Sequence, residues 1–195
     1  MVRGSTSVKA PIQRVAFQGE HGAYSDEVIA HVWQGSAQSC PQRDFRAVIR
    51  EVSTGSVEFG VLPIRNAIAG PVVESEAALA EADDLRVVRE ILFPIRNCLL
   101  ALPGARLDTI RTVMSHPMAI AQCKRFFADH PALTPVPGYD TGGAARHVAS
   151  GRSLTQAAIA GRAAAARYGL TIVLENIDDV PDNRTLFRIV TRKSF

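Results

Sequence analysis

Arg14-Val-Ala-Phe-Gln18, followed by Gly19-Glu-His-Gly-Ala-Tyr-Ser25, is the stretch that decides the fold of this chain. The first block is a short apolar run that stops at a glycine, which predicts a buried strand. The second block is a turn bracketed by glycines, and Ser25 is expected to cap a helix that begins at Asp26. A strand, a turn and a helix in this order are typical of an α/β fold.

The same alternation of strands and helices continues along the chain. Apolar residues at three- and four-residue spacing predict helices over 26–33 and 45–52. A second series begins with a strand at 112–114 and a helix over 118–128. Other segments complete the pattern: strands at 59–63, 134–137, 157–160 and 186–191, and helices at 143–149 and 163–168.

Two such series in 195 residues predict two small lobes that share a cleft. Alternating strands and helices imply mixed, mainly parallel sheets that are covered on both faces. We expect a flexible leader over 1–13, a first lobe formed by 14–97 plus 175–195, and a second lobe over 98–174.

The composition excludes several classes of protein. The net charge is +3, and the basic residues are scattered instead of forming a run with aromatics, so a nucleic-acid binder is not expected. No apolar run approaches the roughly 20 residues of a membrane helix. The absence of an apolar leader and of paired cysteines favours a cytoplasmic protein. The histidines and cysteines lack metal-ligand spacing, so no metal is predicted.

Polar loops follow the expected strands, where ligands bind in open α/β sheets. They are rich in Ser, Thr, Asn and Gly, and such loops offer hydroxyls and amide N–H groups to an anion. Each loop by itself also fits an ordinary helix cap or turn. Dinucleotide, phosphate-loop and nucleophile-elbow motifs are missing. The loops are Gly19–Ser25, Pro63–Gly70, Ser115–Pro117, Tyr139–Gly143 and Asn183–Thr185.

Read together, these loops resemble the prephenate dehydratases and the related arogenate dehydratases, from about Val15 to Lys193. For that family the resemblance implies a two-lobe α/β clamp like that of type II periplasmic binding proteins. The matching blocks are Gly19-Glu-His-Gly-Ala-Tyr-Ser25, Gly60-Val-Leu-Pro-Ile-Arg-Asn66 with Gly70, Ser115-His-Pro-Met-Ala-Ile-Ala-Gln122, Asp140-Thr-Gly-Gly-Ala144, Ala157-Ala-Ile-Ala160 with Tyr168-Gly-Leu170, and Asn183-Arg-Thr-Leu-Phe187.

The resemblance implies a carbon–oxygen lyase that converts prephenate to phenylpyruvate in phenylalanine biosynthesis, without a cofactor. Thr185 would donate a hydrogen bond to the departing hydroxyl, as the threonine of the family's Thr-Arg-Phe motif does. Asn66, Ser115 and Gln122 would orient the substrate. Gln122 lies seven residues after Ser115, so both are expected on one side of one helix unless Gln122 is simply exposed.

The resemblance also implies residues that bind the substrate without reacting. Thr141 and the amides that follow it would hold a carboxylate at a helix start. The expected set is Thr141, Gly142, Gly143, Tyr24, Ser25, Arg65, Ala67 and Phe187. Family members commonly form homodimers, and many continue into a phenylalanine-sensing ACT domain, whereas this sequence ends at Phe195.

Three positions depart from the family pattern. Arg65 and Ala67 stand where a glutamate and a serine are usual, and Leu186 replaces the arginine of Thr-Arg-Phe. We expect the charge changes to be linked, because removing one partner of an acidic–basic pair across the cleft leaves the other unpaired. Arg65 would then replace the missing arginine, or the ligand would be a different one. The alternatives are arogenate dehydratase, a decarboxylase that does not aromatise prephenate, and an inactive paralogue that binds a small carboxylate.

Overall fold

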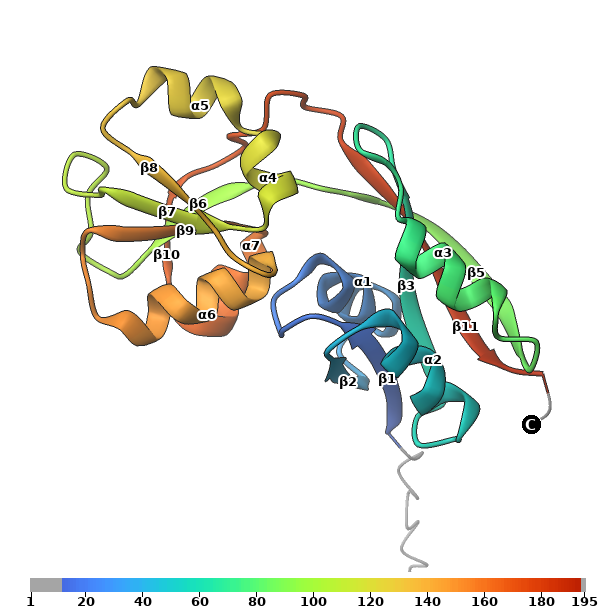
Figure 1. Cartoon of the computed structure of the whole chain (residues 1–195). Coiled ribbons are helices and arrows are strands. Elements are labelled where there is room, and N and C mark those ends of the chain that lie inside the picture. The colour runs from blue at the N-terminus through green and yellow to red at the C-terminus, as the bar shows by residue number, and fades with distance from the viewer. Residues whose placement is uncertain (1–11, 194–195) are drawn as a thin grey trace, which may run out of the picture.

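The computed structural model describes residues 12–193, so nearly all of the expected leader lies outside the described residues. Figure 1 shows two bodies side by side, each a sheet with helices packed against it. The elements are β1 (Gln13–Gln18), α1 (Tyr24–Trp33), β2 (Ala37–Gln42), α2 (Phe45–Ser53), β3 (Phe59–Asn66), β4 (Gly70–Pro71), α3 (Val73–Ala80), β5 (Leu85–Pro94), β6 (Cys98–Ala101), β7 (Thr112–Ser115), α4 (Pro117–Ala121), α5 (Lys124–Asp129), β8 (Thr134–Pro137), α6 (Thr141–Gly151), β9 (Gln156–Ala160), α7 (Arg162–Tyr168), β10 (Thr171–Leu174) and β11 (Arg184–Arg192).

The first sheet has the strand order β2-β1-β3-β11-β5, with β4 paired to β3, and the second has the order β10-β6-β9-β7-β8. The chain therefore leaves the first sheet after β5 and returns to it with β11 (Figure 1). The predicted two-lobe α/β architecture with mixed sheets is confirmed. The sheets were expected to be mainly parallel, but antiparallel strand pairs are more frequent than that. Strand β11 runs antiparallel to both β3 and β5, and β6 runs antiparallel to both β9 and β10.

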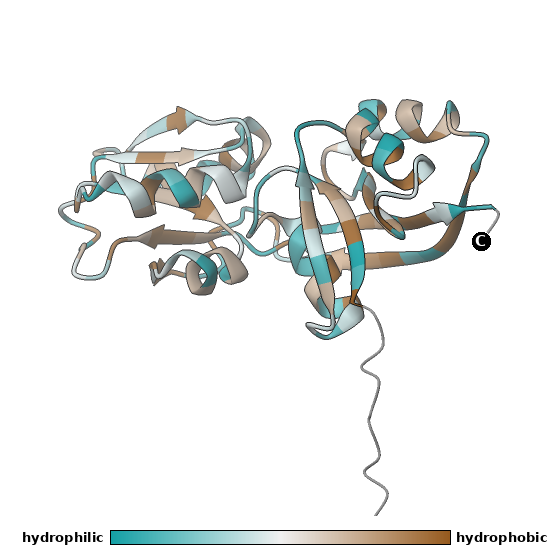
Figure 2. Cartoon of the chain, turned by 90° about the horizontal axis from the view of Figure 1, so that it is seen from below, coloured by the Kyte–Doolittle hydropathy of each residue, from teal (hydrophilic) through white to brown (hydrophobic). Residues whose placement is uncertain are grey.

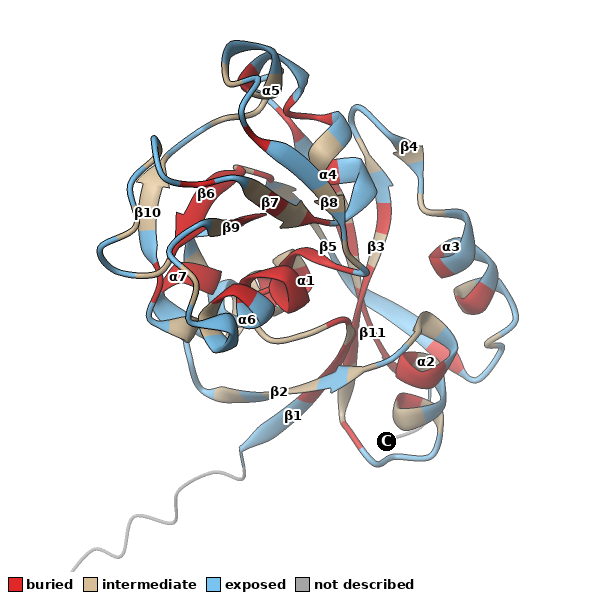
Figure 3. Cartoon of the chain, turned by 60° about the vertical axis from the view of Figure 1, so that its left-hand side comes forward, coloured by how far each residue is buried: buried red, intermediate tan, exposed pale blue. Residues whose placement is uncertain are grey.

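Both faces of each sheet carry a buried apolar cluster. On the first sheet, Phe17 and Phe187 pack under α1, while Leu62 and Val48 pack on the opposite face with α2. Buried residues lie along the strands in the middle of both sheets and on helices that cover them (Figure 3), and apolar residues concentrate along these strands (Figure 2). The lobe boundaries predicted from the sequence stay a proposal, which the strand membership of the two sheets supports.

The first helix begins earlier than expected. Helix α1 starts at Tyr24, so Ser25 lies inside its first turn instead of capping it. The N-cap residue is Ala23, which makes no side-chain capping hydrogen bond. The Asp26 carboxylate instead accepts from the Gly22 amide at 2.8 Å, which fixes the preceding turn. The capping role expected for Ser25 was therefore wrong.

The helix expected over 118–128 is two helices with a break at Gln122 and Cys123. The side chain of Asp179, from the segment before β11, accepts from the Lys124 and Arg125 amides at 2.9 Å each. This distant carboxylate caps a new helix start, which sequence spacing does not reveal. None of the helices in the described part of the chain is long and apolar enough to cross a membrane.

Candidate active site

A bulge in β3 decides which side chains meet at the end of the first sheet. Pro63 pairs with Phe187, but the next pair along the strands is Arg65 with Leu186, so Ile64 is an extra residue in β3. A β-bulge of this kind shifts the alternation of side chains by one position. After the bulge, Asn66 lies directly opposite Thr185 and shares its face of the sheet.

The Asn66 side chain is held in one orientation. Its Oδ1 atom accepts from the backbone amides of Ile68 and Ala69 at 3.0 and 2.9 Å. Its Nδ2 group therefore points the other way, toward Thr185 Oγ1 at 2.9 Å and Asn183 Oδ1 at 2.8 Å. Because the Thr185 oxygen accepts this bond, the hydrogen of its own hydroxyl remains to be donated to another acceptor.

Gln122 approaches the same place from the second lobe. Asn183 Nδ2 donates to Gln122 Oε1 at 3.1 Å, and Gln122 Nε2 lies 3.4 Å from Asn66 Oδ1. Gln122 is 8% exposed, so the expectation that it could be a surface residue does not hold. We call Asn66, Gln122, Asn183 and Thr185 the amide cluster. It brings together three of the four residues expected to act on the substrate.

The fourth, Ser115, is fully buried at the end of β7. Its hydroxyl donates to the carbonyl oxygen of Ile159 on the neighbouring strand β9, at 2.6 Å. Ser115 and Gln122 do not share a helix, because α4 spans only Pro117–Ala121 between them. A substrate role for Ser115 stays a prediction.

The start of α6 is used inside the protein. Asp140 caps the helix by accepting from the Gly143 amide, and its other carboxylate oxygen accepts from the Glu20 amide at 3.0 Å. A Cβ atom at Gly142 would lie 2.7 Å from the His21 carbonyl oxygen, so the helix start packs directly on the first loop. The Gly143 amide is therefore taken by Asp140 and not free for a carboxylate, contrary to our expectation.

Tyr24 belongs to a different group of contacts. Its hydroxyl donates to Asn97 Oδ1 at 2.8 Å, and Asn97 Nδ2 in turn donates to Asp178 at 2.5 Å. Asn97 and Asp178 lie on the two segments that connect the lobes. Burial, reinforced by the negative charge of Glu27, raises the pKa of Tyr24 well above its ordinary value. The Asn97–Asp178 hydrogen bond thus joins the two connections, and Tyr24 holds Asn97.

Two residues expected to bind the substrate lie elsewhere. Phe187 is 2% exposed and packs edge-on against Phe93, with 6.4 Å between the ring centroids, so it is a core residue of the first sheet. Arg65 is exposed, and its cross-strand partner is Leu186 on the face opposite Thr185. Neither side chain is placed beside the Thr185 hydroxyl.

The departures from the family pattern are nevertheless neighbours. Arg65 and Leu186 pair directly across β3 and β11, and Leu186 also pairs with Leu92 of β5. The two positions face each other along the sheet instead of across the cleft, contrary to our expectation, and the link between the two charge changes stays a prediction. Ala67 is exposed in the turn after β3, where its amide donates to the Arg184 carbonyl at 2.8 Å.

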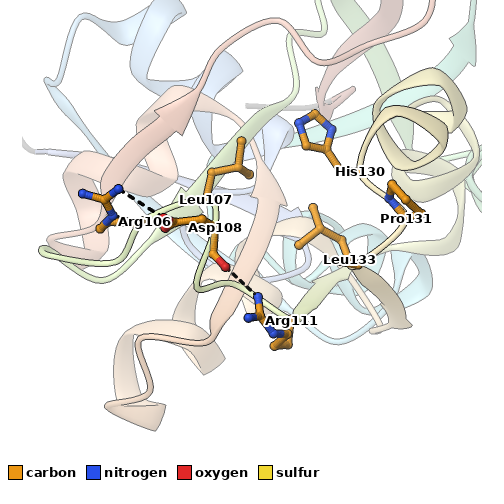
Figure 4. A pocket seen from close by; sticks show the side chains of 8 residues that line it. Arg106, Leu107, Asp108, Arg111, His130, Pro131 and Leu133 are labelled. Atoms are coloured by element: carbon orange, nitrogen blue, oxygen red, sulfur yellow. Dashed lines mark hydrogen bonds and ion pairs between the residues drawn. The ribbon is translucent and has the colours of Figure 1, made fainter.

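A hollow of about 550 Å³ lies in the second lobe, between the loops before β7 and β8 (Figure 4). The charged side chains that line it bond within the loop before β7: Arg106 pairs with Asp108, and Arg111 donates to the carbonyl oxygens of Asp108 and Ile110. It contains none of the expected site residues. Within residues 12–193 no three His, Cys, Asp or Glu side chains gather in a way that would hold a metal ion.

Comparison with known proteins identifies the family. The model of the prephenate dehydratase family matches residues 15–195. The chain belongs to the prephenate dehydratase family. Arogenate dehydratase/prephenate dehydratase 1 of Arabidopsis thaliana is 34% identical over 92% of this chain and 45% of its own length. The chain thus spans about half the length of the plant relatives that it matches.

Bacterial relatives agree with this assignment. A bifunctional N-acyl-homoserine lactone acylase/prephenate dehydratase of Komagataeibacter europaeus is 35% identical over 92% of this chain and 63% of its own length. The crystal structure of prephenate dehydratase from Arthrobacter aurescens, solved with L-Phe, is 30% identical and superimposes with a TM-score of 0.86, over 93% of this chain and 61% of that one. These similarities cover both lobes of this dehydratase fold.

Sequence reasoning missed Asn183, which is 0% exposed and joins Asn66 to Gln122. Its signal was its place in the last matching block, two residues before Thr185. A loop asparagine before a strand is also an ordinary turn residue, so local sequence does not single it out.

Proposed function

We propose that this chain catalyses the decarboxylative dehydration of prephenate to phenylpyruvate. The bond between the ring and its carboxylate breaks, and its electron pair moves through the ring. The carbon–oxygen bond at the opposite ring carbon then breaks, and the departing hydroxide takes up a proton to form water. Carbon dioxide and the aromatic product remain, so the enzyme needs only to position the substrate and to ease departure of the hydroxyl.

The observation that carries the proposal is the Thr185 hydroxyl, which accepts from Asn66 and keeps its hydrogen for donation. A donor aimed at an oxygen on which negative charge develops is worth about 100-fold in rate. Thr185 is 6% exposed, and in such a setting a hydrogen bond is stronger than in water. Thr185 would donate to the departing oxygen and remain neutral throughout.

Asn66 and Gln122 would orient the substrate next to this donor. Both belong to the amide cluster, and they come from different lobes, so a ligand bound there would contact both bodies of the protein. Ser115 and Thr141 stay candidates for contacts with other parts of the substrate. Arg65, Phe187 and the Gly143 amide are left out of this proposal.

Arogenate is the second candidate substrate. The similar plant proteins are named arogenate dehydratases or arogenate dehydratase/prephenate dehydratases, and they match almost the whole chain at about one third identity. Arogenate differs from prephenate only in the side chain, where an amino group replaces the keto oxygen. The ring chemistry at Thr185 would be the same.

The wider role follows from the reaction. We place the chain in aromatic amino-acid biosynthesis, at the step that leads to phenylalanine. A homodimer and a cytoplasmic location, both expected from sequence, are part of this proposal. Sedimentation equilibrium of the purified chain tests the first, because a monomer mass at micromolar concentration would contradict it.

The function is tested by mixing the protein with prephenate and measuring phenylpyruvate by its absorbance in alkali, with arogenate run in parallel. Formation of phenylpyruvate above the uncatalysed rate supports the proposal. Loss of prephenate without phenylpyruvate would indicate a decarboxylase that does not aromatise. Binding without consumption of either compound would indicate a carboxylate-binding paralogue.

A further inference from the structure

Asn183 lies at the centre of the amide cluster and is completely buried. Its Oδ1 accepts from Asn66 at 2.8 Å, and its Nδ2 donates to Gln122 at 3.1 Å. It comes just before β11, and its carbonyl oxygen accepts from the Ile95 amide at 2.9 Å, so its backbone is fixed as well. A buried amide that satisfies two others constrains the orientation of both.

The hydrogen bonds can be followed in one direction around the cluster. Two backbone amides hold Asn66 Oδ1, so Asn66 Nδ2 must face Asn183 and Thr185. Asn183 then presents its oxygen to Asn66 and its nitrogen to Gln122. If the Asn183 amide were flipped, its NH₂ group would face the Asn66 NH₂ group, and its Oδ1 would face Gln122 Oε1. Each group left without a partner costs about 1–3 kcal/mol.

We infer that Asn183 is a positioning residue of the reaction: together with the Ile68 and Ala69 amides it holds the Asn66 donor on the Thr185 oxygen, and it holds the Gln122 amide in its present orientation. The Thr185 hydrogen is thereby left to point at the departing oxygen of the substrate. This inference rests on the proposed dehydratase function. It assigns Asn183 no contact with the substrate itself.

Asn183→Asp tests this, because the new carboxyl has almost the same shape. When ionised, this carboxylate can only accept hydrogen bonds, so it faces the Gln122 Oε1 acceptor without a bond between them. When protonated, it donates to Gln122 Oε1 and restores the wild-type pattern. Burial raises the pKa of such a carboxyl toward neutrality. We expect kcat with prephenate to fall on the order of 10-fold at pH 8 and to recover as the pH falls toward 6, with a smaller change in KM.

Asn176→Asp is the matched control, since it adds the same charge at an exposed position between the lobes. It should keep the wild-type kcat and pH profile. A wild-type kcat for Asn183→Asp at every pH would overturn the inference, and so would a loss of kcat that does not change with pH. An inactive wild type would instead refute the proposed function.

A measurement on the unaltered protein covers the case in which Asn183→Asp does not fold. Nuclear Overhauser contacts of the Asn66 side-chain NH₂ are expected to the Thr185 methine hydrogen, and those of the Asn183 NH₂ to Gln122. Contacts of the Asn66 NH₂ to the Ile68 and Ala69 amide hydrogens instead would show the opposite orientation and overturn the inference. This readout does not depend on turnover.

Discussion

The two lobes contact each other at two very different places. In the amide cluster, side chains from β3, β11 and the end of α4 exchange hydrogen bonds around a threonine hydroxyl. At the second place, which we call the glycine contact, the chain passes so closely at Gly22, Gly142 and Gly161 that a side chain does not fit. In the proposed function the first place presents a donor to the substrate, whereas the second is filled by the protein's own backbone and side chains.

The glycine contact buries an acidic group as well. Glu27 of α1 lies against Gly161, and its carboxylate is 3.4 Å from the Ala163 amide at the start of α7. Burial raises its pKa from 4.5 to about 7. Tyr168 also donates to the His21 carbonyl at 2.6 Å. In the proposed function the two places have different roles: the amide cluster carries the chemistry, and the glycine contact fixes the lobes around it.

The largest effect is expected for Thr185→Val, which keeps the shape and removes the hydroxyl. Loss of this donor should lower kcat with prephenate by on the order of 100-fold. Because Asn66 Nδ2 also loses its Thr185 acceptor, the free energy of unfolding should fall by about 1–3 kcal/mol as well. Thr185→Ser is the control, because it keeps the hydroxyl and should retain most of the activity. Equal activity of the valine and wild-type proteins would place the chemistry outside the amide cluster.

Gly142→Ala should destabilise the protein by about 3 kcal/mol, because a Cβ atom there would lie 2.7–2.9 Å from three backbone atoms of the first loop. Urea unfolding measures this directly. Gly151→Ala in the same helix is the control, since its Cβ atom would meet only the end of the Gln156 side chain. Equal stabilities of the two variants would contradict the close packing at Gly142.

Glu27→Gln should change how stability depends on pH. The pKa of Glu27 is about 7 in the folded state, above the ordinary value of 4.5 that applies in the unfolded chain. The stability that protonated Glu27 contributes is therefore fully present below pH 4.5 and is lost as the pH rises through 7. Between pH 5 and 8 this amounts to about 2 kcal/mol in the free energy of unfolding. The glutamine variant should lack this part of the decline, as urea titrations at both pH values would show; an unchanged decline would contradict the burial of Glu27.

The smallest effect on catalysis is expected for Arg65→Glu. Because Arg65 faces away from Thr185, kcat/KM should stay within about 2-fold of the wild type. Combining it with Leu186→Arg creates an opposite-charge cross-strand pair, which should stabilise the sheet by about 0.2–1 kcal/mol relative to the single change. A large loss of activity in Arg65→Glu would return Arg65 to the substrate site.

Much of this arrangement could be predicted from sequence. The strand–turn–helix pattern and the apolar spacing gave the α/β class, and the matching blocks led to Asn66, Gln122 and Thr185. The β-bulge at Ile64 could not be predicted, since it appears only when β11 pairs with β3, about 120 residues later in the chain. Without it, Arg65 would have been placed beside Thr185.

The same limit applies to the other corrections. The break between α4 and α5 depends on Asp179, which caps the start of α5. The Gly143 amide donates to Asp140, whose other carboxylate oxygen accepts from the Glu20 amide of the first loop. The role of Asn183 depends on its hydrogen bonds to Asn66 and Gln122, which are far away in the sequence. Local patterns predict elements, whereas long-range contacts decide which side chains meet.

The most direct test of the account is a ¹⁵N NMR titration of the wild-type protein with phenylpyruvate, the proposed product. The account predicts that the side-chain amide signals of Asn66 and Gln122 shift while the backbone amide signal of Gly143, which donates to Asp140, stays in place. A shift confined to Gly143, with the side-chain amides unchanged, would contradict it and move the ligand site to the start of α6.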